Sequence, residues 1–138
     1  MMELKTTMVL HVAMFFNLAI LAILFVQSGL DKVFDFKGNL EWLKGHFGNS
    51  PLKGMVKLLL LKITIIEVLA GLFCLLGMVE LVCWEGFYFA FAGIFLSAVA
   101  LVSLFFGQRI AKDYPGAASL VPYFIVTLIG FILIYLVY

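Results

Sequence analysis

Hydrophobic positions fall in four long runs along the chain, and polar positions gather between them. The runs cover residues 8–30, 54–79, 86–107 and 117–138. Each is long enough to cross about 30 Å of hydrocarbon at about 1.5 Å of rise per helical residue. The pattern therefore predicts an all-α, polytopic membrane protein, a single membrane domain over residues 1–138 built as a four-transmembrane-helix bundle.

The connection between the first two runs has a pattern of its own. Phe36, Leu40, Leu43 and Phe47 recur at intervals of four, three and four residues, which places them on one face of a helix. We expect a short amphipathic helix at the membrane interface, with Trp42 at headgroup level. Its role is either that of a lid anchored to lipid or that of a segment that gates a ligand or binds a partner.

Helix-capping and helix-breaking residues predict where the helices begin and end. Ser50 and Pro51 predict the start of the second helix, because a hydroxyl caps an N-terminus well and proline fits the first helical position. Pro115 and Gly116 predict the break before the last helix. The connection at residues 80–85 is so short that the second and third helices must form an antiparallel hairpin.

Composition and charge exclude several classes of protein. The 138 residues are 65% hydrophobic and 12% charged, with a mean hydropathy of +1.20, so a soluble domain is excluded. The net charge of +1 argues against nucleic acid as a partner, whereas membrane lipid is an expected one. Lysine and arginine gather around the first and third connections (Lys32, Lys37, Lys44, Lys53, Lys57, Arg109, Lys112), against Lys5 alone on the other side. This asymmetry predicts that loops 31–53 and 108–116 are cytoplasmic and that both termini lie outside.

Glu67 is the acidic residue inside a run that otherwise reads as bilayer-spanning. A carboxylate at that depth costs about 2.5–3.5 kcal/mol on insertion scales unless it is protonated, paired or facing a polar cavity. We expect Glu67 to point into the bundle and to be protonated or strongly hydrogen-bonded, because burial without a counter-charge disfavours the ionised form. Lys62 lies about 140° away around the same helix and is expected to snorkel toward the basic face.

Counting to the midpoint of each run places one polar residue per helix at a similar depth: Asn17, Glu67, Ser97 and Thr127. We therefore predict a polar core layer that is either structural or ligand-binding. Gly71 follows Glu67 by one helical turn and leaves space beside the acid.

Small residues line one side of the third helix (Gly86, Ala90, Gly93, Ser97, Ala100, Gly107). Such a seam lets helix backbones approach closely in lipid. The seam predicts either a close-packed bundle or a narrow gap between helices for a flat ligand.

A second polar cluster is predicted near the basic face, where the first and third helices end. Its members are Gln27, Ser28, Asp31, Lys32 and Arg109. We predict a contact between Asp31 and Arg109 across the two helices. The alternative is that these residues are ordinary charged and polar side chains at the membrane interface, where each helix ends.

Motifs in three parts of the chain resemble the DoxX family of small bacterial membrane proteins. They are residues 25–32 with Ser28, Gly29 and Lys32, residues 67–71 with Glu67 and Gly71, and residues 108–114 followed by Gly116 and Ala117. The resemblance implies a four-helix protein of the bacterial inner membrane. In some members the family is associated with quinone-linked thiosulfate oxidation, and in others with redox-stress complexes.

Residues for self-sufficient redox chemistry are not evident in the sequence. Cys74 and Cys83 form no Cys-x-x-Cys pair, and His11 and His46 lie in different segments without ligand spacing. We therefore expect no metal site, no intrinsic cofactor and no catalysis by this chain alone.

Three functional hypotheses follow. The first is an accessory subunit of a membrane redox or respiratory-type assembly, with quinone or lipid as the candidate ligand near Glu67 or the second polar cluster. The second is a small proton-coupled transporter or channel that uses Glu67 as its titrating group. The third is a structural or assembly subunit that binds other membrane subunits or a second copy of itself.

Overall fold

The computed structural model describes residues 1–138 and is almost entirely helical. Its elements are α1 (Met2–Phe34), α2 (Phe36–His46), the short 3-10 helix η1 (Lys53–Met55), α3 (Val56–Cys83), α4 (Tyr88–Ile110) and α5 (Tyr114–Val137). It contains no strand. Four of the helices, α1, α3, α4 and α5, are long and apolar enough to cross a membrane. The predicted fold class, an all-α four-helix membrane bundle, is confirmed.

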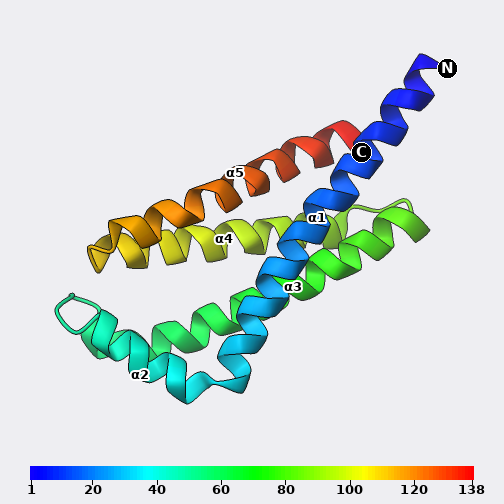
Figure 1. The fold of residues 1–138 in the computed structure, drawn as a ribbon. Helices are drawn as coiled ribbons and strands as arrows, with labels where there is room; N and C mark the ends of the chain where they lie inside the picture. The colour runs from blue at the N-terminus through cyan, green and yellow to red at the C-terminus, as the bar shows by residue number, and fades with distance from the viewer.

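Helix α3 lies at the centre of the bundle. It packs against α1 on one side and α4 on another, and α5 lies against both α4 and α1. The α4–α5 pair comes close to α3 near the connection between α3 and α4 and diverges from it toward the end where α2 lies (Figure 1). The α4–α5 pair therefore lies closer to α3 at one end than at the other.

Small residues bring α3 and α4 together near the connection that joins them. A Cβ atom added to Gly77 would lie 2.7 Å from the Cα of Ala90, and one added to Gly93 would lie 2.7 Å from the backbone nitrogen of Cys74. Contacts that close leave no room for a side chain between the two backbones. The close packing predicted from the small seam of the third helix is confirmed at these positions.

Helix α1 is longer at both ends than its apolar run at residues 8–30 indicated. Polar residues do not oppose helix formation when they are exposed, as Glu3, Lys5 and Asp31 are here. Hydropathy marked the part of the helix suited to lipid, and the hydrogen-bonded helix continues beyond it.

The predicted helix boundaries at the two prolines are wrong by several residues. The Ser50 hydroxyl accepts a hydrogen bond from the backbone N–H of Leu52 at 3.1 Å, so it closes a turn, and α3 begins only after η1. Pro115 lies in the first turn of α5, where its missing N–H costs nothing. The break before α5 comes earlier, at Lys112, which has a positive φ of 60°.

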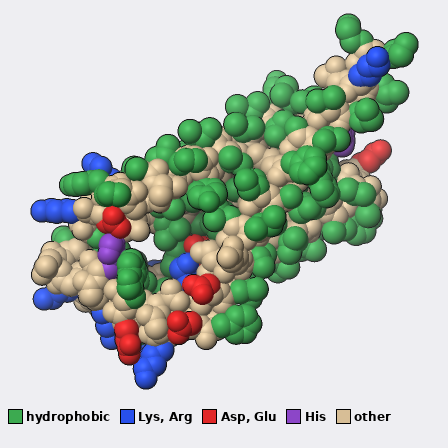
Figure 2. All heavy atoms as spheres, viewed as in Figure 1, with side chains coloured by type: hydrophobic (Ala, Val, Ile, Leu, Met, Phe, Trp, Pro, Cys, Tyr) green, Lys and Arg blue, Asp and Glu red, His purple; other side chains and the backbone are tan.

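The amphipathic helix in the first connection is confirmed as α2. Its apolar face turns toward the bundle, and the ring of Phe47 at its end lies against Gly107 of α4. Trp42 is exposed. Figure 2 shows hydrophobic side chains covering the long helices and most charged side chains gathered at the α2 end, where the surface is hollowed.

Candidate functional site

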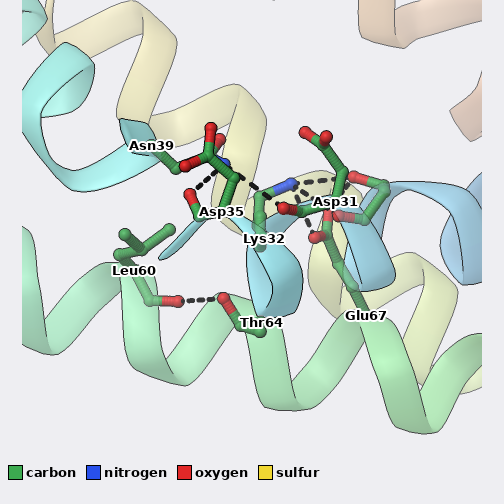
Figure 3. Close-up of polar contacts among 8 residues, drawn as sticks. Asp31, Lys32, Asp35, Asn39, Leu60, Thr64 and Glu67 are labelled. Atoms are coloured by element: carbon green, nitrogen blue, oxygen red, sulfur yellow. Dashed lines mark hydrogen bonds and ion pairs between the residues drawn. The ribbon is translucent and has the colours of Figure 1, made fainter. Parts of the chain in front are cut away.

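Glu67 forms a buried ion pair between α1 and α3. Its side chain is 1% exposed, and its Oε2 atom lies 2.8 Å from Lys32 Nζ. The Ser28 hydroxyl donates to Glu67 Oε1 at 3.1 Å, and Lys32 Nζ donates to Ser28 Oγ at 2.8 Å. Figure 3 shows Glu67 reaching from α3 toward Lys32 on α1. We call these three residues the Glu67 cluster.

The Glu67 cluster corrects one premise of the sequence analysis. Glu67 does point into the bundle, as predicted, but Lys32 supplies a counter-charge that was not expected there. The contact at Oε2 is electrostatic in character, because the ammonium lies at ion-pair distance while this oxygen accepts no directed hydrogen bond. The carboxylate is therefore held by one hydroxyl hydrogen bond and one charge contact.

Close backbone contacts enclose the Glu67 cluster. A Cβ atom added to Gly29 would lie 2.8 Å from Val68 Cγ2, and one added to Gly71 would lie 2.8 Å from the backbone nitrogen of Val26. The two helices thus meet most closely within one turn of Glu67. Water is excluded on this side, which strengthens the electrostatic attraction and also raises the cost of an unpaired charge.

The predicted polar layer of one residue per helix is not formed. The Asn17 amide donates to the backbone carbonyl of Val126 on α5 at 2.8 Å. Asn17 also lies eleven residues before Ser28, about 16 Å along α1 at about 1.5 Å per residue. Glu67 is level with Ser28, so it cannot share a layer with Asn17.

Ser97 and Thr127 donate their hydroxyls within their own helices, although Thr127 lies level with Asn17, next to the Val126 carbonyl that Asn17 contacts. Ser97 donates to the carbonyl of Gly93 at 2.7 Å and lies 3.8 Å from Cys74 Sγ. Thr127 donates to the carbonyl of Tyr123 within its own helix at 2.9 Å. Counting from run midpoints failed because it assumed that all four helices are centred on one plane.

The predicted contact between Asp31 and Arg109 is also not formed. The Arg109 guanidinium lies over the ring of Tyr114, 4.4 Å from its centroid, and the side chain of Asp31 is exposed. Along this stretch α1 packs on α3, so Lys32 faces a partner and Asp31 does not. Of the predicted second cluster, Ser28 and Lys32 join Glu67, while Gln27 stays exposed.

A second polar group, which the sequence analysis did not identify, joins α2 to the other helices. His46 Nε2 lies 2.8 Å from Gln108 Oε1 on α4 and 3.5 Å from Asp113 Oδ2 in the α4–α5 connection. The imidazole also stacks on Trp42, with centroids 4.6 Å apart and planes inclined by 16°. The sequence signal was present but weak: His46 follows Trp42 by one turn at the end of an amphipathic helix.

A cavity of about 480 Å³ lies between α2, α3 and α4, beside the His46 contacts. We call it the groove. Its walls are mostly apolar, and its polar lining side chains are Lys62, Ser103 and Gln108. Ser103 donates its hydroxyl to the carbonyl of Val99 at 2.7 Å. The side chains of Lys62 and Gln108 are therefore the polar groups available to a ligand.

The opposite end of the bundle holds a third polar arrangement. Glu80 is 5% exposed and accepts a hydrogen bond from the backbone N–H of Phe89 at 3.2 Å, at the start of α4. Burial, and then the charge of Glu80, raise the pKa of the Tyr138 phenol. Cys83, near the same end, is a free and exposed thiol, whereas Cys74 is free and buried.

No group of three or more His, Cys, Asp or Glu side chains is arranged to hold a metal ion. Comparisons with protein-family models, with curated proteins and with solved structures find no match to this chain. The function must therefore be inferred from the Glu67 cluster, the His46 contacts and the groove.

Proposed function

We propose that this protein is a DoxX-like accessory subunit of a membrane redox assembly and that the groove binds a quinone-type ring. The groove itself carries the proposal. Its volume of about 480 Å³ falls within the range of about 300–1,000 Å³ that is usual for small-ligand pockets. Apolar walls with a small number of polar groups are also usual for such pockets.

The polar groups of the groove suit a ligand with carbonyl oxygens. The Lys62 ammonium is only a donor, and the Gln108 side chain offers an amide donor as well. Quinone carbonyls are acceptors, and the rest of the ring is apolar and flat. A ring between the α3 and α4 walls would therefore match both the shape and the chemistry of the groove.

The Glu67 cluster lies behind the α3 wall of the groove and holds that wall in place. Ile66 lines the groove and directly precedes Glu67 on α3, while Ile63 lies one turn earlier. By holding α3 against α1, the ion pair fixes the position of the α3 wall. In this proposal the Glu67 cluster is a support of the binding site and does not contact the ligand.

A fluorescence experiment tests the groove. Trp42 and Trp84 are the two tryptophans of the chain, so a Trp84→Phe variant leaves Trp42, which stacks on His46, as the only indole reporter. We expect a short-chain benzoquinone to quench Trp42 saturably in lipid nanodiscs. Gly107→Leu, placed against Phe47 in the groove, should abolish the saturable component.

Gly45→Leu is the matched control, because nothing lies within 4 Å of a Cβ atom at Gly45. It should leave quenching unchanged. Saturable quenching that survives in Gly107→Leu would place the ligand elsewhere, and strictly linear quenching in the parent protein would overturn the proposed function. Displacement of the quinone by added phospholipid alone would identify lipid as the ligand.

The proposal also places the protein in the bacterial inner membrane, with α2 and the α4–α5 connection on the cytoplasmic side. The excess of lysine and arginine around these two segments supports this orientation, and the His46 contacts bring the segments to one end. Exposed Cys83 then faces outward. A membrane-impermeant maleimide should label it in intact cells and should spare buried Cys74, whereas labelling only after lysis would reverse the orientation.

A further inference from the structure

Gln108 connects the groove to the His46 contacts. Its side chain lines the groove, and its Oε1 atom lies 2.8 Å from His46 Nε2. The two ends of an amide have opposite chemistry: the oxygen accepts hydrogen bonds and the NH₂ group donates them. Which end faces His46 therefore decides which end remains for a ligand.

Asp113 determines the orientation of the Gln108 amide. Its Oδ2 atom lies 3.5 Å from the same Nε2 atom of His46, and its Oδ1 atom is held by the backbone N–H of Gly116 at 3.0 Å. A carboxylate oxygen only accepts, so a lone pair on Nε2 would face it unfavourably. Nε2 therefore carries the hydrogen.

With a hydrogen on His46 Nε2, the amide end that meets it must be the oxygen of Gln108. The NH₂ group is then the end left free. Stacking on Trp42 limits rotation of the imidazole, so the first turn of α5, Asp113, His46 and Gln108 form one chain of oriented groups. This chain ends at the wall of the groove.

We infer that Gln108, oriented by His46, is the specificity-determining residue of the groove and selects an apolar ligand that presents a hydrogen-bond acceptor. This inference rests on the proposed binding of a ring in the groove and adds a rule for which ring is preferred. His46 is a positioning residue, because it acts through Gln108 and not on the ligand. A ring with carbonyl oxygens gains a hydrogen bond that a plain hydrocarbon ring of similar size cannot make.

The preference is the ratio of the Kd values of two probes in the Trp84→Phe background, where quenching of Trp42 reports the quinone and displacement of the quinone reports the arene. The probes are a short-chain benzoquinone and the arene of the same ring size that lacks both carbonyl oxygens. One net hydrogen bond corresponds to a preference of up to about tenfold in Kd. We expect the parent protein to favour the quinone by about that factor.

Two variants should remove the preference without removing binding. Gln108→Leu keeps an apolar wall of similar length, so the arene should bind as before and the quinone should lose its advantage. His46→Phe keeps an aromatic ring beside Trp42 but frees the amide, and it should reduce the preference several-fold. Thr6→Val is the matched control, because Thr6 lies near the start of α1, outside the groove, and its hydroxyl is already donated to the carbonyl of Met2, and it should leave the preference unchanged.

The outcomes separate the inference from the proposed function. The inference would be overturned if Gln108→Leu leaves the preference for the quinone unchanged, or if Lys62→Met abolishes that preference and Gln108→Leu does not. In either case the groove would still stand as the binding site. If neither probe binds the parent protein saturably, the proposed function fails, and the inference fails with it. A Gln108-dependent preference for an ester phospholipid over its ether analogue would support the same rule with lipid as the source of the acceptor.

Discussion

Replacing Lys32 with methionine removes the counter-charge of Glu67 while it keeps most of the side-chain volume. The two charged atoms lie 2.8 Å apart and Glu67 is 1% exposed. At an effective dielectric constant of about 20, the gross Coulomb attraction is about 6 kcal/mol, most of which offsets desolvation of the two groups. Removing one partner of a buried pair costs about 3–5 kcal/mol, because the other charge is left without compensation.

The two halves of the pair should not be equivalent. Lys32 lies two residues before the end of α1, and its side chain is 16% exposed, so without Glu67 it can keep its contact with Ser28 and extend toward water. Glu67 lies well inside α3 and has no such route. We therefore expect Lys32→Met to lower the free energy of unfolding by about 3 kcal/mol and Glu67→Leu by about 1 kcal/mol.

Reversible unfolding in mixed detergent micelles, followed by loss of helical circular dichroism, measures both values. Lys57→Met is the matched control, because Lys57 is exposed at the start of α3 and makes no ion pair. The double variant Lys32→Met/Glu67→Leu should recover most of the loss, since it leaves no buried charge. Equal effects of Lys32→Met and Lys57→Met would refute the reasoning, as would a double variant that is less stable than Lys32→Met alone.

Two further predictions concern packing and alkaline titration. Gly71→Ala should lower the free energy of unfolding by about 1–3 kcal/mol, because its Cβ would meet the Val26 backbone at 2.8 Å. Gly45→Ala, whose Cβ would lie in open space, should raise the free energy of unfolding by up to about 1 kcal/mol. The same unfolding assay compares the two variants, and equal effects would contradict the close approach of α1 and α3 at Gly71. Because burial and the charge of Glu80 raise the pKa of Tyr138, its contribution to stability should be complete below the ordinary tyrosine pKa and lost as pH rises through the higher folded value. The tyrosinate absorbance difference between the parent protein and Tyr138→Phe measures that pKa, which Glu80→Gln should lower; an unchanged value would exclude the charge effect.

The four long helices could be predicted because lipid imposes a simple rule: a segment of sufficient length must be apolar nearly throughout. The amphipathic α2 followed from the spacing of four apolar residues. Neither inference needed knowledge of how one helix faces another. The helix ends were less predictable, because turns such as those at Ser50 and Lys112 depend on local hydrogen bonds that hydropathy does not describe.

The partners of Glu67 depended on the rotation of α1 against α3. The sequence pattern assigns Ser28 and Lys32 to a cluster separate from Glu67. Gly29 and Gly71 carried the missing information, because glycines in transmembrane helices mark where backbones approach closely, and the polar residues beside them then meet. In the structure Gly29 meets Val68 and Gly71 meets Val26, and these two contacts lie on either side of the level at which Ser28 meets Glu67.

The His46 contacts could not be derived in the same way. They join the end of α2 to α4 and to the connection that follows it, three segments separated by as many as 67 positions between His46 and Asp113. No periodic pattern links such segments. Their meeting depends on the path of the chain from α2 through the turn to α3, which is a property of the folded structure.

The divergence of α4 and α5 from α3 affects the membrane as well as the groove. Because α3 and α4 are held together through Gly77 and Gly93 at one end and lie further apart at the other, α3, α4 and α5 form a wedge-shaped arrangement. If this wedge spans the bilayer, the leaflet at its wide end accommodates a larger cross-section of these three helices than the other leaflet, and we expect the protein to favour local curvature. If a ligand widens the wedge, linkage requires that curvature alter ligand affinity in return, so we expect occupancy of the groove to depend on the shape of the membrane around it.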